Sequence, residues 1–103
     1  MKIKKGVVLA GLQIPMRTVL KKADRLWKQK GKELVITSGL EGTHSAGSLH
    51  YYGYALDFRT RYFTAIQCVQ LQRSLATALG PEYVVLFEGN HMHVQYGRAK
   101  TYI

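Results

Sequence analysis

Apolar residues recur every three or four positions between Met16 and Trp27, which is the spacing of an amphipathic helix. Proline is tolerated in the first turn of a helix, so Pro15 favours a start at this point, and Gly31 favours an end. The apolar stripe consists of Met16, Val19, Leu20, Ala23, Leu26 and Trp27, and the opposite side of the helix is rich in lysine and arginine.

A second helix is predicted from about Thr64 to Leu79. Thr64 and Gln67 have the spacing of a capping box, in which the two side chains satisfy free backbone N–H groups of the first turn. The dipeptide Gly80-Pro81 then stops the helix.

Runs rich in β-branched and aromatic residues predict four strands. A loop of glycine, serine and histidine, Gly39–Ser48, separates the first two. This order of elements predicts one α+β domain over residues 1–103, with a small antiparallel sheet flanked by two helices. We expect a basic N-terminal arm at 1–12 and a C-terminal tail at 97–103. The strands are expected at Glu33–Ser38, Tyr54–Phe58, Tyr83–Glu88 and Met92–Tyr96.

Charge is the unusual feature of the composition. The 103 residues are 47% hydrophobic, as in an ordinary globular domain, but 15 Lys and Arg against 6 Asp and Glu give a net charge of +9. A solvated helix face explains much of this charge, and a polyanionic partner is the alternative. No nucleic-acid-binding motif accompanies the charge, so we expect no specific nucleic-acid partner. The single cysteine, Cys68, excludes an internal disulfide and a cysteine-based zinc finger.

The apolar run Gly6–Gly11 is too short for a signal peptide and far too short to span a bilayer. We therefore expect no membrane span and synthesis in the cytoplasm, with any action outside depending on release by another factor.

The segment around Asp57 suggests a site for something other than protein. On a strand, residues two apart share a face, so Gly53, Ala55 and Asp57 are expected to point the same way. Two very small side chains beside a carboxylate leave space, and His50 precedes this strand by about one turn.

The last predicted strand carries histidines at alternate positions, so they too share one face. His91, His93 and Gln95 share one face, and Met92 and Val94 are expected to face the core. Two histidines and one carboxylate are a ligand set of catalytic zinc, which leaves a fourth position for water. The alternative is an ordinary pair of strand histidines that neighbouring groups satisfy.

The pattern Ser48-x-His50-x-x-Gly53-x-Ala55-x-Asp57, followed by His91-x-His93, resembles the zinc D-Ala-D-Ala metallopeptidases of bacteria and their phages. That superfamily includes the L-alanyl-D-glutamate endopeptidases of phage endolysins and the hedgehog signalling domain. The resemblance covers residues 37–96. It implies a hedgehog/DD-peptidase-like fold and zinc-dependent hydrolysis of peptidoglycan stem peptides or cross-links, as in a phage or prophage lysis protein.

Carried over, the resemblance makes His50, Asp57 and His93 the zinc ligands and places His91 beside the reacting oxygen. His91 is the alternative third ligand, because Glu88-x-x-His91 copies the Glu-x-x-His of the dipeptidase branch, where the glutamate is the general base. His93-x-Gln95 is similar to the ligand-x-acid ending of the carboxypeptidase branch, which favours His93.

The sequence departs from the family's pattern at two positions that bear on the mechanism. Asn90 stands where the carboxypeptidase pattern has an acid, which leaves Glu88 as the nearby carboxylate. Glu41 stands where the family has an arginine that grips a substrate carboxylate, and Arg59 or Arg61 is the available substitute. A weaker carboxylate grip favours an endopeptidase over a strict carboxypeptidase.

Two further residues belong to the predicted site. Ser48 is expected to hydrogen-bond a ligand or the loop backbone, and His44 either lines the cleft or points into solvent. The basic helix face and arm would help the protein reach anionic wall or outer-membrane polymers. A zinc-binding domain without hydrolysis is the alternative function.

Overall fold

The computed structural model describes residues 1–42, 44 and 48–97. Residues 98–103 of the expected C-terminal tail lie outside this range. In chain order the elements are β1 (Lys2–Ile3), α1 (Pro15–Gln29), β2 (Val35–Ser38), a short 3₁₀ helix η1 (Leu49–Tyr52), β3 (Ala55–Arg59), α2 (Ala65–Leu79), β4 (Tyr83–Phe87) and β5 (His91–Tyr96).

Both predicted helices form, for the reasons that the sequence indicated. α1 begins at Pro15 and buries Met16, Val19, Ala23 and Trp27, which are four members of the expected stripe. α2 has Thr64 as its N-cap, and both hydrogen bonds of the capping box with Gln67 are present. Neither helix is long and apolar enough to cross a membrane, and no other described helix is.

The sheet is mixed, which corrects the expectation of a purely antiparallel sheet. Its strand order is β1-β2-β3-β5-β4, and β1 pairs with β2 in parallel while the other neighbours are antiparallel. The two-residue β1 is too short to leave a periodic signal in the sequence. Its pairing ties the start of the expected N-terminal arm to the edge of the sheet.

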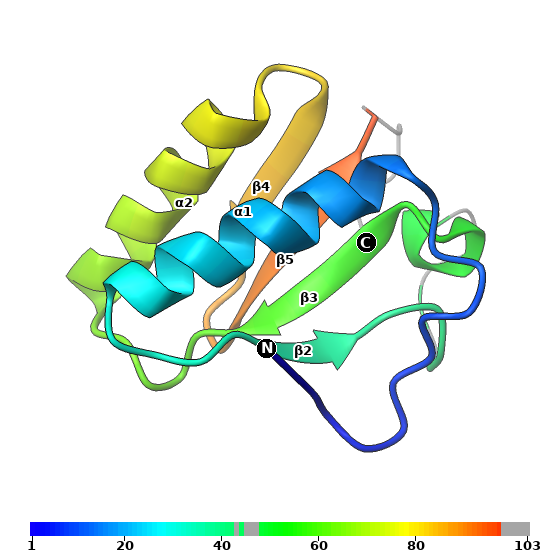
Figure 1. Cartoon of the computed structure of the whole chain (residues 1–103), viewed down its shortest axis with the longest axis horizontal. Coiled ribbons are helices and arrows are strands. Elements are labelled where there is room, and N and C mark those ends of the chain that lie inside the picture. The colour runs from blue at the N-terminus through cyan, green and yellow to red at the C-terminus, as the bar shows by residue number, and fades with distance from the viewer. Residues whose placement is uncertain (43, 45–47, 98–103) are drawn as a thin grey trace.

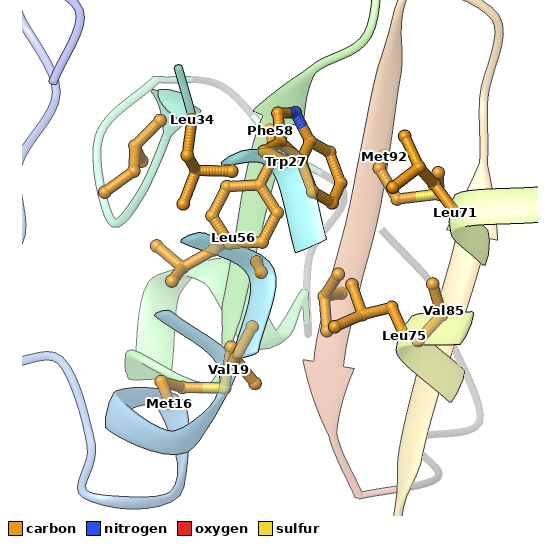
Figure 2. Close-up of a cluster of buried hydrophobic side chains, with 13 residues drawn as sticks. Met16, Val19, Trp27, Leu34, Leu56, Phe58, Leu71, Leu75, Val85 and Met92 are labelled. Carbon is orange, nitrogen blue, oxygen red and sulfur yellow. The ribbon is translucent and has the colours of Figure 1, made fainter. Parts of the chain in front are cut away.

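Both helices cover the same face of the sheet, as Figure 1 shows. Trp27 of α1 lies edge-on to Phe58 of β3 with ring centroids 5.9 Å apart, while Leu71 and Leu75 of α2 pack toward β4 and β5 (Figure 2). Met92 of β5 faces this core, as predicted. Because strand residues alternate, the residues between the core positions point to the other face, which neither α1 nor α2 covers.

Candidate metal centre

Strand register brings Asp57 and His93 together on the face away from the helices. In the antiparallel pair of β3 and β5, Asp57 lies opposite His93, and Arg59 lies opposite His91. On the other side of β3, a register shift places Ser38 opposite Asp57. Such an irregularity twists a strand locally and is common beside functional sites.

The 3₁₀ helix η1 supplies His50. The side chain of Ser48 caps η1 by accepting a hydrogen bond from the backbone N–H of His50 at 3.2 Å. Ser48 therefore supports the loop backbone, which is one of the two roles expected for it. Gly53 ends this turn with a φ of +78°, in the left-handed region that favours glycine.

Gly53 does not open space for a ligand, which corrects the expectation drawn from its small size. A Cβ atom at Gly53 would lie 2.2 Å from the backbone oxygen of Gly11. The residue is small because the chain before α1 passes directly against it.

Three side-chain atoms converge at the centre. His50 Nε2 lies 3.3 Å from Asp57 Oδ1 and 3.3 Å from His93 Nδ1, and His93 Nδ1 lies 2.9 Å from Asp57 Oδ1. Both histidines are fully buried, and 12% of the Asp57 side chain is exposed. The structure thus groups His93, and not His91, with His50 and Asp57.

The outer hydrogen bonds fix which ring nitrogens carry protons. His50 Nδ1 faces the carbonyl oxygen of Gly39 at 2.8 Å and must donate to it, because a carbonyl only accepts. His93 Nε2 donates to Gln95 Oε1 at 2.7 Å, and the amide of Gln95 is oriented by its own donation to the oxygen of Gly97. When both imidazoles are neutral, the lone pairs of His50 Nε2 and His93 Nδ1 therefore point toward each other and toward the carboxylate of Asp57.

This donor set fits a metal ion. Three lone pairs that face one another within a buried site need a cation between them. In tetrahedral zinc sites with bonds of about 2.0–2.1 Å, neighbouring ligand atoms are about 3.4 Å apart. The separations of 2.9–3.3 Å among His50, Asp57 and His93 need only a small outward relaxation to match. The three residues are placed to hold a metal ion.

Without a metal, a proton takes the place of the cation. Burial alone would raise the pKa of Asp57, but hydrogen bonds from His50 and His93 outweigh it and hold the pKa well below its ordinary value. Burial likewise opposes charge on His93, but the hydrogen bonds to Asp57 and Gln95 raise the pKa of His93 above its ordinary value. The metal-free site therefore favours a protonated His93 beside an ionised Asp57.

The two predicted catalytic residues form a separate pair, one step along the same face. Glu88 Oε1 lies 3.3 Å from His91 Nε2, and His91 Nδ1 lies 2.7 Å from Asn90 Oδ1. Glu88 Oε1 is buried and has no hydrogen-bond partner among the described residues. The negative charge of Glu88 contributes to the raised pKa of His93, which places Glu88 electrostatically within the site.

His44 lies against the centre instead of pointing into solvent. Its ring stacks on that of His50, with centroids 4.1 Å apart and planes 4° apart. His44 Nε2 faces the carbonyl oxygen of Glu41 at 3.0 Å, which anchors the ring. His44 thus restricts the movement of the His50 imidazole.

A cleft of about 290 Å³ opens beside Asp57. Arg59, predicted as a substrate contact, lines it together with Arg61. Sequence reasoning missed Lys4, which reaches the cleft because β1 pairs with β2. The full lining is Lys4, Thr37, Ser38, Asp57, Arg59, Arg61, Asn90 and His91.

Sequence reasoning also missed the role of Glu41. Its Oε1 accepts hydrogen bonds from the backbone N–H groups of Val8 at 2.8 Å and Gly39 at 2.9 Å. Burial would raise the pKa of Glu41, but these backbone hydrogen bonds outweigh it and lower the pKa. Glu41 thereby fixes the backbone at Gly39, the residue whose carbonyl orients His50. No local sequence pattern signals a contact between residues 8 and 41.

No protein-family model matches this chain, and a search of curated proteins finds no significant relative.

Proposed function

We propose that this protein is a zinc-dependent peptidase that hydrolyses D-amino-acid-containing bonds in peptidoglycan stem peptides or cross-links. The convergence of three lone pairs from His50, Asp57 and His93, at the edge of a cleft, carries the proposal. Two imidazoles and one carboxylate suit zinc among the common metals. Bound there, zinc would polarise a carbonyl and lower the pKa of water.

Residues of this chain are proposed to orient the metal ligands, accept a proton and stabilise developing negative charge. Gly39 and Gln95 hold the ligand imidazoles in the required protonation pattern. Glu88, whose Oε1 lies 3.3 Å from His91 Nε2, is the proposed general base, since the chain has Asn90 where the family's pattern has an acid. His91 lines the cleft and is proposed to stabilise negative charge that develops on the scissile carbonyl oxygen.

Localisation follows from the substrate. We propose action at the cell wall or periplasm after release, as in a phage or prophage lysis protein. The exposed basic residues Arg17, Lys21 and Arg25 of α1 lie on the side of the molecule away from the metal centre. Their charge would favour contact with anionic wall or outer-membrane polymers.

Metal analysis combined with digestion of purified sacculi tests the proposal. Wild type should bind one zinc and release peptide fragments with new termini. His50→Ala and His93→Ala should lose both properties, whereas His91→Ala should keep its zinc and lose most of its activity. Absence of any fragment from a protein with confirmed zinc would refute the peptidase.

Complete burial of both ligand histidines favours a second candidate, a zinc-binding domain without hydrolysis. Glu88→Gln separates the two, because this change keeps the size of the side chain and removes the base. A peptidase should lose activity by about 10²–10⁴-fold with zinc retained. A structural site should show no change in any function that depends on zinc.

A further inference from the structure

Positive charge dominates the outer surface of the two helices, on the side of the sheet away from the metal centre (Figure 1). α2 contains no acidic residue, and the one acidic residue of α1, Asp24, is paired with Lys28 at 3.1 Å. Lys21 and Arg25 are exposed on α1, and Arg73 is exposed on α2. This surface therefore attracts anionic groups.

Two hydrogen bonds between side chains of α1 and residues of α2 hold the helices side by side. Lys22 Nζ donates to the carbonyl oxygen of Ala78, and Lys30 Nζ donates to Gln70 Oε1 at 2.9 Å. The partner on α2 moves backward along the chain as the donor on α1 moves forward, so the helices run antiparallel. This alignment places Arg73 within about one helical turn of the level of Arg25. The outward side chains of both helices thus form one continuous face.

A basic pocket of about 460 Å³ opens on this face. It is lined by Thr18, Lys21, Lys22 and Arg25, whose spacing of i, i+3, i+4 and i+7 puts them on one side of α1. Three cations and a hydroxyl in one pocket suit a phosphate group, because phosphate oxygens accept hydrogen bonds and carry negative charge.

Apolar side chains are exposed at both ends of the same face. Ile66 is 73% exposed and Val69 is 42% exposed, and both line a second pocket of about 360 Å³ together with Arg73. Ile14 is also 73% exposed. Its backbone is already helical and it precedes Thr18 by four residues, so it lies on the same side of α1. Exposed hydrocarbon therefore flanks the cations of the helix face.

The combination of cations and exposed hydrocarbon favours one kind of partner. A polyanionic polymer would satisfy the cations but leave Ile14 and Ile66 in water. A second copy of the chain, docked through the same face, would bring Lys21 and Arg73 against the like charges of its partner. An anionic phospholipid bilayer offers phosphates and hydrocarbon in one interface.

We propose that the outer face of α1 and α2 binds the surface of an anionic phospholipid bilayer. The basic pocket takes lipid phosphates, and Ile14, Ile66 and Val69 enter the boundary between headgroups and acyl chains. Because the metal centre lies on the opposite face of the sheet, the cleft beside Asp57 stays open to water while the helices lie on the bilayer. This inference goes beyond the proposed function and does not depend on it.

Co-sedimentation of the full chain with lipid vesicles tests the inference. The protein should bind vesicles of equal parts phosphatidylcholine and phosphatidylglycerol, and it should not bind vesicles of phosphatidylcholine alone. Lys21→Gln combined with Arg25→Gln should weaken binding to the mixed vesicles about 25-fold, since each cation near an anionic surface contributes about fivefold. Equal binding to both kinds of vesicle, or no binding to the mixed vesicles, would overturn the inference.

Lys2→Gln combined with Lys5→Gln is the matched control for charge. Both residues are exposed, one in β1 and one in the segment after it, and the double change removes the same charge from a region outside the helices. Binding to the mixed vesicles should change less than about threefold, because exposed charges farther away than a Debye length are screened. An equal loss in this control would show a general effect of net charge and contradict the proposal.

Ile66→Gln combined with Val69→Gln tests the apolar part without changing the charge. Both positions are exposed and glutamine favours helices, so the variant should fold, which circular dichroism checks. Binding to the mixed vesicles should fall at least about tenfold, whereas binding to heparin, a soluble polyanion, should not change. Unchanged binding to vesicles would show a site for polyanions driven by charge alone. A change from dimer to monomer in size-exclusion chromatography would assign the patch to self-association, and either result would overturn the inference.

Ile66→Trp gives an independent measure of contact with the bilayer. Its fluorescence should shift to shorter wavelength with the mixed vesicles and not with heparin, over a constant contribution from the buried Trp27. Absence of this shift in a protein that sediments with the vesicles would place the helix face away from the lipid and refute the proposal. The zinc content should be unchanged in all of these variants, so the result is separate from that for the metal centre.

Discussion

Replacement of Gln95 tests whether the pattern of protonation at the centre decides metal affinity. Gln95 is fully buried, and its Oε1 accepts the proton of His93 Nε2 at 2.7 Å. In Gln95→Leu this acceptor is lost, so a neutral His93 keeps its proton on Nδ1, where it can donate to Asp57, instead of on Nε2. The lone pair needed by a metal is then no longer available at Nδ1.

The magnitude follows from the bond that is lost. A buried N–H without a partner costs about 1–3 kcal/mol, and about 1.4 kcal/mol corresponds to a tenfold change in affinity. Gln95→Leu should therefore weaken zinc binding about 10–100-fold, in the range known for residues that orient metal-bound histidines. Gln95→Glu is the matched control, since a carboxylate still accepts from Nε2–H and should preserve or increase the affinity.

Competition with a chromophoric zinc chelator at pH 7 measures these affinities, and circular dichroism checks folding. Unchanged zinc affinity in Gln95→Leu would refute the reasoning. Equal losses in Gln95→Leu and Gln95→Glu would also refute it, because they would show that shape and not hydrogen-bond acceptance matters at this position.

Three further predictions concern stability. The metal-free protein should be most stable between about pH 4 and 6.5. The raised pKa of His93 contributes stability that is fully present below the ordinary value of 6.5 and is lost as pH rises, while the lowered pKa of Asp57 contributes stability that is present above 3.8 and is lost as pH falls. Urea unfolding in a chelator from pH 3 to 9 checks this, and stability still rising at pH 8 would contradict it. Glu41→Ala should cost about 1–3 kcal/mol in urea unfolding and weaken zinc binding, because two backbone N–H groups lose their acceptor, and an unchanged midpoint would exclude this role. Trp27→Ala should cost about 3–5 kcal/mol, since the ring is fully buried, and a thermal scan showing a much smaller loss would indicate that the core is not packed as described.

Several elements could be predicted from the sequence because they depend on contacts between neighbouring residues. The stripe from Met16 to Trp27 and the capping pair Thr64 and Gln67 depend on neighbours within one helix, so helix position followed from spacing alone. The alternation of His91 to Gln95 likewise assigned each side chain to a face. Pattern reasoning worked where the relevant contacts were local.

Only the tertiary structure decided which segments meet, because this depends on contacts between residues that are distant in the sequence. The choice of His93 over His91 in the cluster follows from the register between β3 and β5, since a shift of two residues would bring His91 opposite Asp57 instead. The parallel pairing of β1, and with it the place of Lys4 in the cleft, rests on two residues with no periodicity of their own. The sequence by itself determined which residues offer metal-binding atoms and which strand face they share. The packing of segments far apart in the chain determined which of them meet, because register and close approach depend on the whole sheet.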